Sequence, residues 1–300
     1  MLIDTHCHLH CPEFDEDRAA MLVRAASAGV SHCVTIGTDL ETSRRSVALA
    51  RQMPGVSATV GWHPHDAQQW TDGARDEMGR LSADPAVVAI GEIGLDYYRD
   101  LSPRPAQQEV FRRMIRLARE RQLPVVLHSR SAAAPGIVSS KGDSREAHAD
   151  LLAILREEWT PPLRGVMHCF SGDAALVERC VAMGLFISFA CNLLYKSSGV
   201  LREASIAVPE DRLLTETDAP FLSPPDRRGR RNEPSAVRAV AEGLAALRGV
   251  SVEVIAASTA RNAAALFGPR LREPLAAAAA PRSAAASGIA LPNGDSRSSA

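Results

Sequence analysis

Histidine, glutamate and aspartate residues follow short apolar segments at widely separated points of the chain. The six residues in question are His6, His8, Glu92, His128, His168 and Asp218. Any one of them could be a solvated strand end, a cap or half of a salt bridge. Together they are restricted to imidazole and carboxylate, which are the ligands that divalent transition metals take in proteins. Buried carboxylates without a cation would be costly. The pattern therefore predicts a metal centre.

The size of this ligand set favours two ions rather than one. Six ligands exceed the four of a tetrahedral ion, and two ions about 3.5–4 Å apart need a carboxylate between them. Glu92 follows a middle segment, between the two groups of ligands, and is the expected bridge. Mixed imidazole and carboxylate ligands suit Zn²⁺, Mn²⁺ or Mg²⁺. A carboxylated lysine as bridge is excluded, because neither Lys141 nor Lys196 ends a strand ahead of the ligands. Ions that only stabilise the fold, or a barrel that only binds protein, are disfavoured, since structural metal sites are usually closed.

Short apolar segments alternating with helical ones would position these residues. The apolar segments are Leu2–Asp4, His32–Ile36, Val56–Val60, Val87–Ile90, Pro124–Leu127, Gly165–His168, Phe186–Phe189 and Leu213–Glu216. The segments with helical periodicity include Asp17–Ala28, Thr42–Gln52, Gln107–Gln122, Asp150–Glu158, Asp173–Met183 and Ser235–Arg248. Strands that are apolar on both faces are typical of a parallel sheet covered by helices.

This alternation predicts the α/β fold class and a (β/α)8 TIM barrel. The strands of such a barrel end at one mouth, where all six ligands would meet. A doubly wound open sheet is the structural alternative, but no glycine-rich phosphate fingerprint follows any strand. We expect the barrel, with its metal centre, to span residues 1–269. Residues 132–147 read as an inserted mobile loop. Residues 270–300, rich in Ala, Ser and Pro, are expected to be disordered because they lack large apolar side chains.

Composition limits the classes of protein. The 300 residues include 34 basic and 35 acidic ones, for a formal net charge of −1. A protein that binds nucleic acid through its overall charge is excluded, so any phosphate-binding surface must be local. No apolar run approaches the roughly 18 residues of a membrane span, and a secretory signal is not evident. We therefore expect a cytoplasmic protein that does not bind membranes. The six cysteines contain no CxxC pair and are expected to be reduced.

Longer motifs resemble those of the TatD family of metal-dependent deoxyribonucleases, a branch of the amidohydrolase-like TIM barrels. The matching segments are DTHCHL at 4–9, GWHPH at 61–65, IGEIGLDYY at 90–98, LPVVLHSR at 123–130, GVMHCFSG at 165–172, ETDAPFL at 216–222, RGRRNEP at 228–234 and NAAALF at 262–267. They follow one another over the whole predicted barrel and leave out only the tail. Three features depart from the family pattern: His10, Ser131 and the insertion at 132–147.

The resemblance implies a reaction and a division of the ligands. His6, His8 and Asp218 would hold one ion, His128 and His168 would hold the other, and both would share Glu92. The implied reaction is hydrolysis of phosphodiester bonds, typically the 3′-to-5′ removal of nucleotides from DNA. Asp218 and Glu92 would be its catalytic residues. Nucleic acid, with DNA expected, is then the substrate, and no obligate protein partner is evident. The alternative is hydrolysis of an amide, lactone or small phosphoester at the same binuclear site.

Several residues near the predicted mouth are candidates for substrate binding. They are His63, His65, Arg130, Arg228, Arg230 and Arg231. A guanidinium group can bind two phosphate oxygens at once. A neutral amide substrate would give no reason for an arginine cluster beside Asp218. Each arginine alone is ordinarily a surface charge, and either histidine is equally well a structural one. Trp62, Tyr97, Tyr98 and Phe170 are candidates for stacking on bases, with packing as the alternative. Asp4 would orient His6 or His8, or form a turn.

Overall fold

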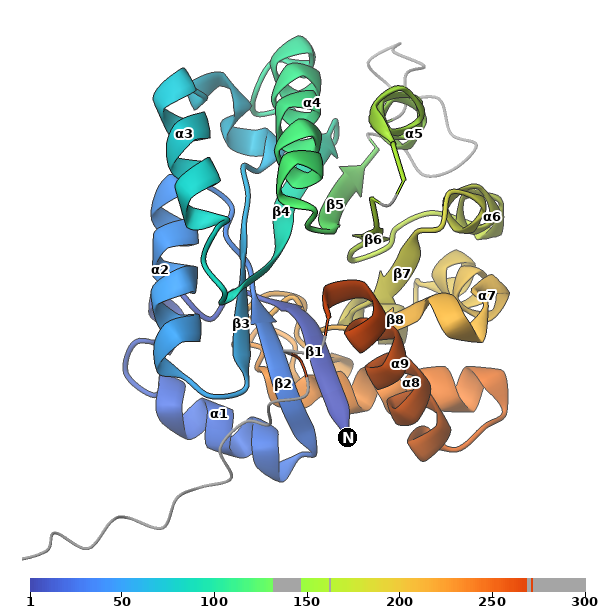
Figure 1. Ribbon diagram of the computed structural model, residues 1–300. Coiled ribbons are helices and arrows are strands. Elements are labelled where there is room, and N and C mark those ends of the chain that lie inside the picture. Colours follow the sequence, from blue (N-terminus) through green and yellow to red (C-terminus); the bar gives the residue numbers. More distant parts are fainter. Residues whose placement is uncertain (132–146, 162, 269–270, 272–300) are drawn as a thin grey trace, which may run out of the picture.

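Eight parallel strands form a barrel in the computed structural model, which describes residues 1–131, 147–161, 163–268 and 271 (Figure 1). The strands are β1 (Leu2–Cys7), β2 (Val30–Thr35), β3 (Val56–Val60), β4 (Val87–Asp96), β5 (Val125–Arg130), β6 (Gly165–Met167), β7 (Phe186–Phe189) and β8 (Leu213–Thr215). They are hydrogen-bonded in sequence order. The segment after β8 returns to β1, where the His8 N–H donates to Ala219 O at 2.7 Å and the Asp218 N–H donates to His6 O at 2.9 Å. The predicted (β/α)8 barrel is confirmed.

Helices follow the strands and cover the outside of the barrel (Figure 1). They are α1 (Arg18–Ser27), α2 (Leu40–Gln52), α3 (Asp72–Leu81), α4 (Arg104–Arg121), α5 (Ala147–Glu158), α6 (Ala174–Ala182), α7 (Gly199–Ala207), α8 (Val237–Arg248) and α9 (Val252–Phe267). Short 3-10 helices occupy Pro12–Phe14, Pro64–Gln69, Cys191–Leu194, Glu210–Arg212, Pro225–Arg227 and Pro234–Ala236. No helix among the described residues is both long and apolar enough to cross a membrane.

Strand β4 is longer than predicted, and its length shapes the site. It continues past Ile90 to Asp96 and stays paired with β5 as far as Asp96 and Arg130. A Cβ atom at Gly94 would overlap the main-chain oxygen of His128, so only glycine fits there. Gly94 and His128 are partners in the register. The close approach therefore carries Glu92 and Asp96 to the side of His128.

Two apolar clusters stabilise the barrel. One joins side chains from every strand except β3 to the end of α9, and its members are Ile3, Val34, Ile36, Val88, Ala89, Val126, Val166, Phe186, Leu214, Ala263, Leu266, Phe267 and Leu271. A set drawn from so many strands lies inside the barrel. The other, larger cluster packs strands against the surrounding helices. Leu271, which the sequence assigned to the tail, is buried in the inner cluster, so the packed domain extends beyond 269. The rest of the predicted tail and of the 132–147 insertion, apart from Ala147, lies outside the described residues. All six cysteines are free, as predicted.

Candidate metal centre

A cavity of about 700 Å³ opens at the carboxyl ends of the strands. Its lining includes His8, Glu92, His128, His168 and Asp218. The predicted residues His63, His65 and Arg130 line it as well. A larger cavity of about 910 Å³ lies beside the start of β1 and α9, and none of the predicted site residues lines it. The barrel therefore brings the predicted ligands to one mouth, as its topology requires.

Glu92 lies at the centre of the cluster. Its Oε1 is 2.8 Å from His128 Nδ1, 2.8 Å from His168 Nε2 and 3.4 Å from His63 Nε2. Its Oε2 is 3.4 Å from His6 Nε2. Burial raises the pKa of Glu92, but the neighbouring imidazoles, led by His168 and His63, lower it more, so the pKa stays well below its usual value. Glu92 is therefore a buried carboxylate that faces ring nitrogens on several sides.

A second group of ligand atoms lies on the β1 side of Glu92. His8 Nε2 is 3.2 Å from Asp218 Oδ1, and His6 Nε2 is 3.6 Å from the same oxygen. His6 and His8 are two residues apart at the end of β1, a spacing that places both side chains on one face. Burial raises the pKa of Asp218, but the hydrogen bond with His8 and the charge of His8 lower it below its usual value. Asp218 is thus a carboxylate at neutral pH.

These donor atoms fit divalent metal ions. His6 Nε2 and His8 Nε2 face each other at 3.3 Å, as do His128 Nδ1 and His168 Nε2. Two N–H groups cannot donate to each other, whereas a cation satisfies two facing lone pairs. Burial lowers the pKa of His6, and His168 lowers it further, so the His6 imidazole is neutral as a ligand must be. The atoms of His6, His8 and Asp218 lie within 4.8 Å of one another, and so do those of His63, Glu92 and His128.

Asp96 is a member of the site that sequence reasoning missed. It is 1% exposed, and its Oδ2 accepts hydrogen bonds from His65 Nε2 at 2.9 Å and His128 Nε2 at 3.1 Å. Its Oδ1 accepts from the main-chain N–H groups of Tyr98 and Arg99. With Nε2 bound to Asp96, His128 turns Nδ1 toward Glu92. The signal was alternation along β4, because Glu92 and Asp96 lie on the same face once the strand continues past Ile90.

Glu216 is a second missed residue. Its side chain is buried, and its Oε1 accepts a hydrogen bond from the Cys169 N–H at 2.6 Å and lies 3.4 Å from His168 Nδ1. It therefore lies beside the ring edge of His168 that faces away from Glu92. In the sequence, Glu216 is the last residue of the predicted strand Leu213–Glu216. Its spacing of two from Asp218 was the available signal.

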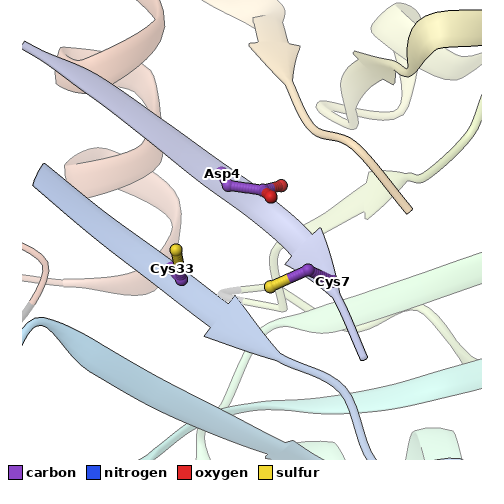
Figure 2. Close-up of side chains that lie close together, drawn as sticks. All are labelled: Asp4, Cys7 and Cys33. Atoms are coloured by element: carbon purple, nitrogen blue, oxygen red, sulfur yellow. The ribbon is translucent and has the colours of Figure 1, made fainter. Parts of the chain in front are cut away.

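Asp4 does not orient an imidazole as expected. Its carboxylate accepts from the Thr217 N–H at 2.9 Å and from Thr217 Oγ1 at 2.6 Å, and it also accepts from the His6 main chain at 3.3 Å. It therefore fixes the chain just before Asp218. Figure 2 shows Asp4 with Cys7 and Cys33, whose sulfur atoms lie within 4.8 Å of the carboxylate and of each other. Both carboxylate oxygens of Asp4 already accept hydrogen bonds from Thr217, which lies outside this second group.

The arginine cluster after Asp218 does not reach the cavity. Arg231 does not line the cavity, and its guanidinium donates to both carboxylate oxygens of Asp17, at 2.7 and 2.9 Å, and to Glu233 at 2.8 Å. Arg228 lies over the Tyr195 ring, 4.7 Å from its centroid. Arg230 is exposed, and neither it nor Arg228 lines the cavity. The partner Asp17 is more than two hundred residues away in sequence, so the pairing was not visible there.

Other predicted contacts divide between the mouth and the core. Arg130 lines the cavity and lies over the Tyr98 ring, 4.0 Å from its centroid. The unpredicted Arg99 also lines it. The buried aromatics Trp62, Tyr97 and Phe170 pack in the core instead. His10, one of the departures from the family pattern, is buried with Nδ1 3.3 Å from Ser46 Oγ.

Comparisons with known proteins agree over nearly the whole chain. The family model described as TatD related DNase matches residues 3–268. The uncharacterized metal-dependent hydrolase YabD of Bacillus subtilis is 40% identical over 89% of this chain and 99% of its own length. The 3′-5′ ssDNA/RNA exonuclease TatD of Erwinia amylovora is 39% identical over 89% of this chain and all of its own. The crystal structure of YjjV, a TatD homolog from Escherichia coli, is 32% identical, with a TM-score of 0.80 over 89% of this chain and 97% of that one.

Proposed function

Because this chain belongs to the TatD family and is a metal-dependent hydrolase, we propose that it removes nucleotides from the 3′ end of single-stranded DNA with two divalent ions. The observation that carries this proposal is the position of Glu92, between two groups of ligand atoms on the floor of an open cavity. A relative 39% identical to this chain is named as a 3′-5′ single-strand exonuclease.

The residues divide between the two ions as follows. His6, His8 and Asp218 would hold the first, His63, His128 and His168 would hold the second, and Glu92 would lie between them. Zn²⁺, Mn²⁺ and Mg²⁺ each suit this mixture of imidazole and carboxylate. When bound, such ions would lower the pKa of a water molecule and compensate the negative charge of the phosphoryl oxygens.

The side chains of the site have separate tasks. The Asp218 side chain is 17% exposed and that of Glu92 is 5% exposed, so Asp218 is the carboxylate that water reaches more readily. Asp218 is ionised at neutral pH and accepts the proton of the attacking water. Asp96 and Glu216 hold His128 and His168 in orientation. Arg99 and Arg130, at the mouth, bind the phosphates of the strand that enters.

Degradation of end-labelled oligonucleotides tests the function. With Mg²⁺ or Mn²⁺ we expect the purified protein to release a 3′ label before a 5′ label, as mononucleotides, and to stop when a chelator is added. Parallel DNA and RNA strands, single and paired, define the substrate. If the protein leaves all of these intact and cleaves small esters, lactones or amides instead, the alternative hydrolase is correct. Activity that survives complete metal removal would contradict the metal-dependent mechanism.

Arg130→Ala tests the phosphate contact. We expect it to raise KM for a single-stranded oligonucleotide about tenfold with little change in kcat, since it removes one charge-assisted contact. It should also reduce the slope of log(kcat/KM) against log[salt] by about 0.7, the value for one phosphate contact on a single strand. Steady-state kinetics at several salt concentrations measure both. Arg231→Ala is the matched control, because its guanidinium is bound to Asp17 and Glu233. Equal effects in the two variants would contradict the assignment.

A further inference from the structure

An exposed phenylalanine lies at the rim of the cavity, three residues after Asp218. Phe221 is 51% exposed and lines the cavity beside His8, Asp218 and Leu222. Its ring is T-shaped to the His8 ring, with centroids 5.6 Å apart. Single exposed apolar side chains are ordinary on protein surfaces, so the exposure alone is uninformative. The informative feature is that the ring lies beside the candidate metal ligands His8 and Asp218.

The loop that carries Phe221 is held rigidly. The Phe221 N–H donates to Asp218 O at 2.9 Å. The side-chain amide of Asn232, itself 2% exposed, donates to the main-chain oxygens of Thr217 at 3.1 Å, Phe221 at 2.8 Å and Leu222 at 3.4 Å. These bonds tie the Phe221 backbone to that of Asp218. The ring is thus presented at a fixed place relative to the ligand cluster, which limits the entropy lost when it binds something.

Phe221 also differs from the other aromatic residues near the site. It is the only Phe, Tyr or Trp among the described residues that line this cavity. Trp62, Tyr97 and Phe170 are buried. The Tyr98 ring is covered on one side by the Arg130 guanidinium. Tyr98 is also exposed but does not line the cavity, so Phe221 is the exposed aromatic ring of the cavity wall among the described residues.

We propose that Phe221 is a base-stacking residue, whose ring binds the nucleobase of a nucleotide next to the scissile phosphate. The inference rests on the proposed nuclease function. A base is joined to its phosphate by a single sugar, so a phosphate bound at the proposed metal centre would bring the attached base close to the rim. Every base has a flat π surface, so this subsite tolerates any sequence. It also favours single-stranded or frayed ends, because a base stacked in a duplex must first be released.

A cycle of protein and substrate changes tests the contact. The proteins are wild type, Phe221→Ala, Phe221→Leu and Phe221→Trp, each with bound metal. The substrates are a single-stranded oligonucleotide and versions with an abasic residue at the 3′ terminal or penultimate position. On the intact strand we expect Phe221→Ala to lower kcat/KM about tenfold, mainly through KM, as expected for the loss of one base stack. Phe221→Leu should resemble Phe221→Ala, and Phe221→Trp should resemble wild type.

The decisive result is the coupling between ring and base. If the ring contacts the base, kcat/KM of the wild type should fall on one of the abasic strands by about as much as Phe221→Ala lowers it on the intact strand. Combining Phe221→Ala with that abasic strand should lower kcat/KM little further. Val200→Ala, a similarly exposed residue (52%) on α7 outside the cavity, is the control and should change nothing. If the effects of Phe221→Ala and of base removal on kcat/KM are fully additive at both abasic positions, the stacking contact is wrong, while the proposed nuclease function stands. A wild-type protein that degrades no strand would overturn the proposed function and this inference with it.

Discussion

Replacing Glu92 by glutamine is expected to lower turnover on an oligonucleotide by roughly 10²–10³-fold and to reduce the amount of bound metal. Glu92 approaches the imidazoles of His6, His63, His128 and His168 within 3.4 Å. Loss of a residue that only supports a metal ligand already costs about 10–100-fold in metal affinity or activity, and loss of the charge on the shared carboxylate is expected to cost more. Glutamine has the same shape, so the loss reports the charge. Elemental analysis of the purified protein and single-turnover kinetics measure the two effects.

A matched change separates this effect from general instability. Glu158 is also a largely buried glutamate, but it is paired with Arg116 on the outside of the barrel. Glu158→Gln should lower the melting temperature without changing the metal content or kcat at a temperature where the protein is folded. Wild-type turnover with two ions bound in Glu92→Gln would contradict the central place of Glu92. So would a loss of metal in Glu158→Gln.

The closeness of the predicted ligands could be inferred from the sequence because a barrel brings the ends of its strands together. His128 and His168 are forty residues apart, yet one lies near the end of β5 and the other directly follows β6, and the carboxyl ends of parallel barrel strands meet at one mouth. Knowing that β5 and β6 are neighbours in the sheet is enough to bring their ends together. No distance had to be known in advance. The same argument applies to Asp218, which follows the last strand.

Contacts that depend on the length of a strand or on loops distant in sequence could not be predicted from the sequence. The apolar run of β4 stops at Ile90, but the strand continues through two glycines to Asp96, so the residue that orients His128 was overlooked. Arg231 looked like a phosphate ligand because it stands near Asp218 in sequence. Its actual partner, Asp17, precedes α1 at the other end of the chain. Side-chain pairing of this kind is decided by packing of loops, which local sequence patterns do not encode.

Asp218→Asn is expected to lower kcat by roughly 10²–10³-fold, even when metal is added to saturation. Asp218 has a φ of +57°, a left-handed conformation that asparagine adopts as readily as aspartate, so the loop and its hydrogen bond to His6 should persist. The asparagine oxygen can still face His8 and His6, and metal affinity should fall less than turnover does. A neutral amide, however, cannot accept a proton from water, and loss of one general base contributes about 10²–10⁴-fold.

Turnover measured against metal concentration distinguishes the two tasks of Asp218. If it were only a ligand, excess metal would restore wild-type kcat in Asp218→Asn, and the assigned proton transfer would be wrong. Asp226→Asn, at an exposed aspartate eight residues further along the chain and outside the cavity, is the control and should match wild type. Since Asp218 is the more exposed of the two central carboxylates, at 17% against 5%, a loss that metal cannot restore would assign to it the proton of the attacking water.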